Sequence, residues 1–256
     1  MNANPDCTEP ENLTGGNSNI VQRVGDRVRR SSGPWTPTVH SLLRTLRDNG
    51  IEEVPEPFGV DDEGRELLSF IPGTVANYPL PNWMWSEAIL EEASTLLRRM
   101  HDATMDVLFD SAVWQSASHE PQQVICHNDF APYNMVFDQE HLVGVIDFDT
   151  ASPGPRVWDL AYMAYRLVPF GEDSGTDAPP AEARMSRLKA AIRAYGMTFD
   201  LEEVLEVMAV RLEDLAIYTD GRASDTGDAG FTEHAAMYRR DATRVRELFR
   251  TQAGSR

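Results

Sequence analysis

The sequence contains little lysine, little cysteine and no long apolar segment. Lys189 is its only lysine, so almost all of its basic side chains are arginines. Two cysteines, Cys7 and Cys126, are too few for a disulfide framework and form no CxxC pair. No apolar run approaches the roughly 20 residues of a transmembrane helix, and the polar first residues do not resemble a signal peptide. We therefore expect a cytoplasmic protein without a membrane partner.

Positive charge is also scarce relative to negative charge. The chain has 41 acidic and 23 basic residues, which give a formal net charge of -18. Because this charge repels phosphate, the composition argues against nucleic acid as a partner. It is compatible with a cationic small-molecule ligand. The hydrophobic fraction of 41% and the charged fraction of 25% are typical of a soluble globular protein.

The first third of the chain predicts a small antiparallel sheet with one helix. Residues 1–12 are expected to form a flexible N-terminus. Gly25-Asp26 is a hairpin dipeptide between the expected strands "NIVQRV" and "RVRRS". A helix is expected over 36–50, followed by a second hairpin in "PEPFGVDDEGRELLSFIPG". Residues 13–73 are therefore expected to form the first lobe.

The remainder, residues 74–256, is expected to form a mainly helical second lobe. Apolar residues recur at helical spacing between Ile89 and Met100. Short strands are expected around 124–126, 135–137 and 142–147. Further helices are expected at about 157–167, 180–195, 201–219 and 231–250, with a Gly- and Asp-rich loop at 220–230.

Two short polar motifs, "HNDFAPYN" and "IDFD", lie between apolar runs in the middle of the chain. Asp129 and Asn134 lie in a segment that contains Pro132, so they belong to a loop between strands. Asp147 ends the apolar strand that follows. An amide oxygen and a carboxylate at adjacent strand ends suit Mg²⁺, while Asp129 stays free to accept a proton from a hydroxyl. This is the layout of a phosphoryl-transfer site.

These residues resemble the aminoglycoside phosphotransferase and choline kinase-like family, a branch of the protein-kinase fold. The catalytic-loop pattern H-x-D-x-x-x-x-N of that family is matched by His127, Asp129 and Asn134. Its metal-binding Asp, which opens a short D-F/W-D/E stretch, is matched by Asp147. The helix-start Asp that braces the catalytic loop is matched by Asp159 in "VWDLAY".

The resemblance covers roughly residues 13–250 and implies an α+β fold with the two lobes of a protein kinase. It implies an enzyme that uses Mg²⁺ and ATP or GTP. Such an enzyme transfers the γ-phosphoryl group to a hydroxyl of a small molecule of the aminoglycoside or amino-alcohol type. The implied roles are base for Asp129, metal ligands for Asn134 and Asp147, and structural support of the loop for His127 and Asp159.

The first lobe departs from the family pattern. The family carries a Lys on the third strand that contacts the nucleotide phosphates, paired with a Glu from the following helix. The matching strand "RVRRS" offers Arg29 and Arg30, either of which can hold phosphate. The helix offers His40 in place of the Glu. Gly15 and Gly16 are expected to form either a phosphate-covering loop or a plain turn.

Two further regions have alternative interpretations. Backbone groups near Ser69, Phe70 and Ile71 can hydrogen-bond a purine between the lobes, or can belong to an ordinary edge strand. Glu213 and Asp214 are either contacts for a cationic acceptor or part of a solvated acidic face.

Two other functions stay open from sequence alone. The missing Lys–Glu pair also fits a pseudokinase that acts as a nucleotide-binding regulatory or interaction module. A metal-dependent hydrolase built on His127, Asp129, Asp147 and Asp149 is the third hypothesis. Asp149 itself is either a second metal ligand or a loop carboxylate, and the oligomeric state is open.

Overall fold

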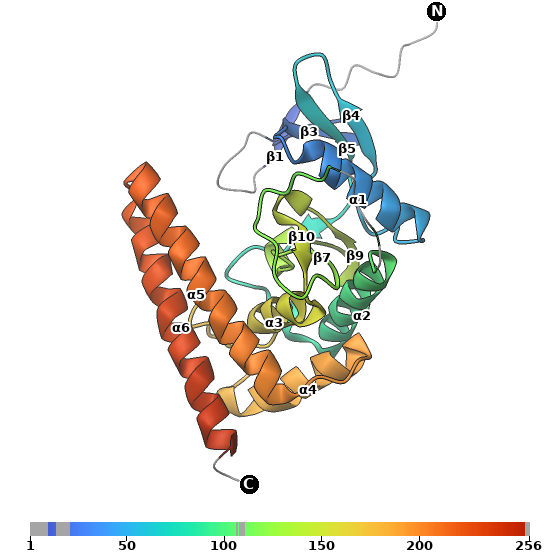
Figure 1. Cartoon of the computed structure of the whole chain (residues 1–256). Helices are drawn as coiled ribbons and strands as arrows, with labels where there is room; N and C mark the ends of the chain where they lie inside the picture. The colour runs from blue at the N-terminus through green and yellow to red at the C-terminus, as the bar shows by residue number, and fades with distance from the viewer. Residues whose placement is uncertain (1–9, 14–20, 106, 108–110, 254–256) are drawn as a thin grey trace, which may run out of the picture.

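The computed structural model describes residues 10–13, 21–105, 107 and 111–253 (Figure 1). Gly15 and Gly16 lie outside the described residues, as does most of the expected N-terminal segment. The first lobe is a five-stranded antiparallel sheet with the strand order β1-β2-β3-β5-β4. Its strands are β1 (Glu11–Leu13), β2 (Val21–Val24), β3 (Arg27–Ser31), β4 (Pro57–Val60) and β5 (Arg65–Ser69).

One helix, α1 (Thr36–Asp48), packs on this sheet. Its apolar residues fall on a single face because they follow helical spacing, and the buried ones are Val39, Leu42, Leu43 and Leu46. Pro37 lies in the first turn, where its missing N–H has no intrahelical partner to lose. The predicted small lobe of antiparallel strands and one helix is confirmed.

The chain then passes to a second set of strands that carries the polar motifs. β6 (Thr74–Val75), β8 (Met135–Asp138) and β9 (His141–Val145) form a three-stranded antiparallel sheet, and β7 (Val124–Cys126) pairs with β10 (Ser152–Gly154). Gly73, just before β6, lies against the carbonyl of Phe137: a Cβ there would be 2.6 Å from that oxygen. The predicted lobe boundary at residue 73 thus lies between β5 and β6.

Among the described residues, five α-helices complete the second lobe. They are α2 (Glu87–Ala103), α3 (Arg156–Leu167), α4 (Arg184–Tyr195), α5 (Leu201–Thr226) and α6 (Ala229–Ala253). α3 is buried along its whole length, and its packing with α2 and α5 forms the centre of the apolar core. α5 and α6 lie side by side as a long antiparallel pair (Figure 1). None of the described helices is long and apolar enough to cross a membrane.

The loop expected at 220–230 is largely helical, so that prediction is wrong. α5 continues to Thr226, and α6 begins at Ala229 after a short turn. Gly227 supplies the left-handed residue (φ 70°) that ends α5. Asp220, inside the expected loop, pairs with Arg239 of α6. Packing of the two helices therefore overrides the weak helix propensity of the Gly and Asp residues.

Candidate active site

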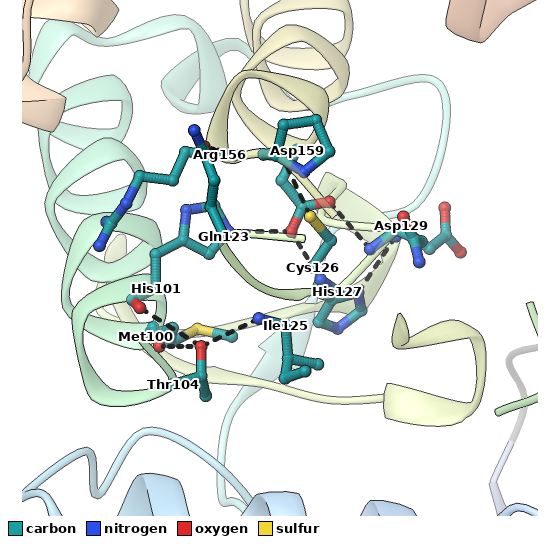
Figure 2. A network of polar contacts seen from close by, with 12 residues as sticks. Met100, His101, Thr104, Gln123, Ile125, Cys126, His127, Asp129, Arg156 and Asp159 are labelled. Carbon is teal, nitrogen blue, oxygen red and sulfur yellow. Dashed lines mark hydrogen bonds and ion pairs between the residues drawn. The ribbon is translucent and has the colours of Figure 1, made fainter. Parts of the chain in front are cut away.

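The loop between β7 and β8 is held in place by Asp159 of α3. The Asp159 carboxylate accepts hydrogen bonds from the backbone N–H groups of His127 (2.6 Å) and Asn128 (2.9 Å). Burial opposes its ionisation, but its hydrogen bond with His101 and the nearby positive charges keep its pKa below the ordinary value. Figure 2 shows Asp159 turned toward the loop backbone, while Asp129 points away from it. The loop therefore rests on a charged buried brace.

His127 connects this loop to the end of β9. Its Nδ1 accepts from the backbone N–H of Asp129 (3.2 Å), and its Nε2 donates to the carbonyl of Ile146 (3.1 Å). The ring contacts Phe130 and Phe148 and is almost fully buried. Both nitrogens are used by backbone groups, so His127 has no free nitrogen for a metal. This geometry removes one of the ligands on which the hydrolase hypothesis depends.

Two neighbouring residues bind the two carboxylate oxygens of Asp129. The hydroxyl of Tyr133 donates to Oδ1 (2.5 Å), and Nδ2 of Asn134 donates to Oδ2 (2.9 Å). The same Asn134 amide group donates to the backbone carbonyl of Asp129 (2.9 Å). With its NH₂ group committed to Asp129, Asn134 directs its own Oδ1 away, which leaves that oxygen available to a cation.

Strand pairing brings Asp147 next to Asn134. Met135 of β8 pairs with Val145 of β9, and the N–H of Ile146 donates to the carbonyl of Asn134 (2.9 Å). Asp147 follows in a left-handed conformation (φ 64°), which is unfavourable for a non-glycine residue and is found at functional sites. Its side chain is half exposed. An amide oxygen and a carboxylate thus lie at one edge of the hairpin, a donor set that fits a hard divalent cation.

Arg30, and not Arg29, faces this edge. Successive side chains of a strand point to opposite sides, and Arg29 binds Asp61 at the turn between β4 and β5. Arg30 is 8% exposed and reaches across to the loop after β9. Its terminal nitrogens donate to Asp147 (2.9 Å) and Asp149 (2.6 Å). Strand β3, which contains no lysine, therefore places the guanidinium of Arg30 next to Asp147, the predicted metal ligand.

The carboxylate partner of Arg30 comes from the sheet. Glu66 of β5 stands directly opposite Arg30 in the register, and its carboxylate accepts from Nε of Arg30 at 2.5 Å. His40 of α1 contacts the other oxygen of Glu66 at 2.8 Å. Burial opposes the charge of Arg30, but Glu66, Asp149 and Asp147 raise its pKa above the ordinary value. Glu66 was not predicted as a site residue. Its spacing of two from Leu68 in the same strand could have placed both side chains on one face of the sheet.

Asp149 sits deeper than Asp147. Burial raises its pKa above the ordinary value, although the nearby Arg30 guanidinium acts in the opposite direction. Because Asp149 and Asp147 bind the same guanidinium, the two carboxylates of "IDFD" converge. Asp149 is therefore placed as a second acidic group beside the predicted ligand.

Two of the three backbone positions expected at the purine site are already engaged. The N–H of Ser69 donates to the carbonyl of Glu56 (2.9 Å), and that of Phe70 donates to the carbonyl of Asp26 (2.7 Å). The side chain of Ile71 packs beside Gly144, where a Cβ would meet it at 2.8 Å. Of the three backbone N–H groups, that of Ile71 is therefore the remaining candidate for donation to a base.

The two acidic residues expected on the acceptor side differ in their surroundings. Glu213 forms an ion pair with Arg246 of α6, and this hydrogen bond lowers its pKa. Asp214 is exposed, and it lies within one turn of Arg211, whose guanidinium donates to the backbone carbonyl of Asn128. Glu213 thus joins two helices, while Asp214 lies on the side of α5 next to the loop between β7 and β8.

Comparisons with known proteins show what this chain is similar to. Residues 109–207 match the phosphotransferase enzyme family. A trifolitoxin immunity protein of Rhizobium leguminosarum bv. trifolii is 40% identical over 168 residues, and this match spans 63% of this chain and 63% of that protein. The chain therefore matches less than two thirds of the length of that relative.

Several solved structures are similar to this chain in fold. A choline/ethanolamine kinase family protein from Mesorhizobium loti has a TM-score of 0.64 at 16% identity, covering 94% of this chain and 89% of that one. Amicoumacin kinase in complex with AMP-PNP, Ca²⁺ and Ami has a TM-score of 0.67 at 14% identity, covering 93% of this chain and 88% of that one. The fold is kinase-like. The resemblance to aminoglycoside phosphotransferases and choline kinase-like proteins is confirmed.

Proposed function

We propose that this kinase-like protein is a Mg²⁺-dependent phosphotransferase that moves the γ-phosphoryl group of ATP or GTP to a hydroxyl of a small molecule. The observation that carries the proposal is the contact between Arg30 and Asp147. It brings the cation of the first lobe to the same edge as the carboxylate of the second. In a pseudokinase that had lost its phosphate anchor, the pair with Glu66 would keep the cation in the sheet, but nothing would require its contact with Asp147.

Each residue has a defined task in this proposal. Asn134 and Asp147 hold the divalent cation, which neutralises charge on the triphosphate when it is bound. Arg30 binds phosphate: an arginine has more N–H donors than the three that contact Glu66, Asp147 and Asp149, so donors remain for phosphate oxygens. Asp129 accepts the proton of the acceptor hydroxyl as it attacks.

The acceptor class follows from the relatives and stays a proposal. Two structural neighbours are named as an amicoumacin kinase and a spectinomycin phosphotransferase, and a relative is named as a trifolitoxin immunity protein. We infer that the acceptor is a hydroxylated antibiotic or toxin and that phosphorylation of it protects the cell. The exposed Asp214 suits an acceptor with a positive charge.

Replacement of the base tests the enzyme proposal. Asp129→Asn removes the group that accepts the proton but keeps an oxygen for Tyr133, so we expect ATP to bind as before and transfer to fall by about 100-fold or more. Thermal shift with ATP and Mg²⁺ measures binding. Phosphate transfer to streptomycin, spectinomycin and ethanolamine measures activity. Normal turnover by the variant would contradict the role of Asp129, and a wild-type protein that ATP does not stabilise would favour the pseudokinase.

A further inference from the structure

A continuous chain of hydrogen bonds runs from a buried arginine to the proposed base. Nε of Arg166 donates to the hydroxyl of Tyr162 (3.3 Å), and the hydroxyls of Tyr162 and Tyr133 are 2.8 Å apart. The hydroxyl of Tyr133 contacts Oδ1 of Asp129 at 2.5 Å. Helix α3 supplies Arg166 and Tyr162, so the catalytic loop is connected to the most buried helix of the protein.

The chemistry of the two ends fixes the direction of every bond in this chain. Arginine is a donor only, and an ionised carboxylate is an acceptor only. Tyr162 therefore accepts from Arg166 and donates to Tyr133, and Tyr133 donates to Asp129. Each hydroxyl is polarised by the donor before it, which strengthens the last bond of the chain. Tyr133 is thereby a committed donor to one oxygen of Asp129.

The donors of this chain are a guanidinium and two phenol hydroxyls. Arg166 lies near five tyrosine rings, with its guanidinium carbon 4.8–5.9 Å from their centroids, and pairs with Asp173. The arginine is therefore held as a cation in an aromatic surrounding, with Nε directed at Tyr162.

The bond from Tyr133 completes the fixation of the carboxylate. Asn134 binds Oδ2 of Asp129, and Tyr133 binds Oδ1, so neither oxygen can rotate without losing a hydrogen bond. A base must lie within hydrogen-bond reach of the proton it takes, and small displacements at such a site lower the rate strongly. The lone pairs that remain on Asp129 therefore keep one direction toward the acceptor.

We propose that Tyr133, held by Tyr162 and Arg166, is a positioning residue that orients the carboxylate of Asp129 toward the acceptor hydroxyl. This assignment rests on the proposed phosphotransferase function. Nothing in the family pattern H-x-D-x-x-x-x-N specifies a tyrosine at this place. The predicted consequence is a change in the rate of transfer and not in the binding of nucleotide.

The test compares three Tyr→Phe variants of the full-length protein, each of which keeps its ring and loses one hydroxyl. Tyr133→Phe is expected to lower kcat about tenfold to hundredfold, with the KM for ATP unchanged. Tyr162→Phe removes an earlier bond of the chain and should lower kcat by a smaller factor. Tyr165→Phe is the matched control, because Tyr165 packs in the same aromatic group but donates to Asp241.

The kinetic outcomes separate positioning from a general structural effect. Equal kcat values for Tyr133→Phe and the wild type would overturn the proposal, as would an equal loss in Tyr165→Phe. A Tyr133→Phe variant with reduced kcat, wild-type KM for ATP and wild-type melting temperature supports it.

The wild-type protein could show no phosphate transfer to any acceptor tested. Such a result would count against the proposed function but would not test the position of the Asp129 carboxylate, so a second measurement that needs no activity is required. Crystal structures of the wild type and of Tyr133→Phe would then decide. The Asp129 carboxylate should lose its single orientation in the variant, and an unchanged, fully ordered carboxylate would overturn the proposal.

Discussion

Arg30 and Glu66 face each other across the neighbouring strands β3 and β5, with Nε of the arginine 2.5 Å from the glutamate oxygen. Glu66 is almost completely buried, and Arg30 is its charged partner. From there the guanidinium reaches Asp147 and Asp149 of the second lobe. One side chain therefore links the sheet of the first lobe to the proposed metal site.

Removal of this arginine should damage both stability and nucleotide binding. Arg30→Met leaves Glu66 buried without its charged partner, and we expect a loss of about 3–5 kcal/mol in the free energy of unfolding. Arg30→Lys should retain only part of the ATP affinity. The lysine keeps the positive charge, but its ammonium group cannot reach three carboxylates at once. Urea unfolding and ATP titration measure the two effects.

The neighbouring arginine provides the control. Arg29→Met breaks a pair with Asp61 that is partly exposed, so the unfolding free energy should fall by less than about 1 kcal/mol and ATP affinity should not change. If the two methionine variants behaved alike, the distinction between Arg29 and Arg30 would be wrong.

Asp147 should determine the metal dependence of nucleotide binding. Asp147→Asn replaces a charged ligand with a neutral one, so the part of the ATP-induced thermal shift that requires Mg²⁺ should be lost. Asp138→Asn, an exposed position at the far end of the same hairpin, should keep it. The measurement is a Mg²⁺ titration at fixed ATP, with and without EDTA. A full Mg²⁺ response in Asp147→Asn would exclude this residue as a ligand.

The brace at Asp159 predicts a loss of stability at acid pH. Its pKa is lowered in the folded protein, so its contribution is fully present above the unfolded pKa of about 3.9 and is lost as the pH falls below it. Asp159→Asn should be less stable at pH 7 and should show a flatter pH dependence below about pH 4. Chemical unfolding at several pH values checks this, and parallel curves for both proteins would contradict it.

The acceptor side can be divided by two substitutions. Glu213→Gln should lower the unfolding free energy by less than about 1 kcal/mol, because the pair with Arg246 is partly exposed, and should leave transfer kinetics unchanged. Asp214→Asn should raise the KM of a cationic acceptor such as streptomycin. Acceptor kinetics of both variants provide the measurement. A raised acceptor KM in Glu213→Gln alone would reverse the assignment.

The sequence was sufficient for the parts of the fold that depend on local pattern. The hairpin at Gly25-Asp26, the strands of the central hairpin and the helix at Asp159 follow from spacing and turn residues. The prediction of a loop at 220–230 was wrong because it rested on the low helix propensity of the Gly and Asp residues alone. There, Gly221 weakens the helix by about 1 kcal/mol, and packing against α6 offsets this loss.

Other parts of the site depend on register and on long-range contacts. The partner of Arg30 was expected on the helix, where only His40 was available. Glu66 lies opposite Arg30 because β3 pairs with β5 in one register, although the two residues are 36 positions apart in the sequence. No sequence pattern marked Tyr133 as a site residue, since its proposed role depends on Tyr162 and Arg166 of α3. Site residues whose function depends on position within a motif could be predicted, whereas those that depend on tertiary contacts could not.

The origin of Glu66 in the sheet has a consequence for how the protein can be controlled. When the partner of the phosphate-binding cation lies on a helix, a movement of that helix can assemble or dismantle the site. Here both members of the pair are fixed by one strand ladder, and α1 contributes only the contact from His40. A displacement of α1 would leave the pair intact. The Arg30–Glu66 pair is therefore set by the strand register, and we do not expect a movement of α1 to switch it.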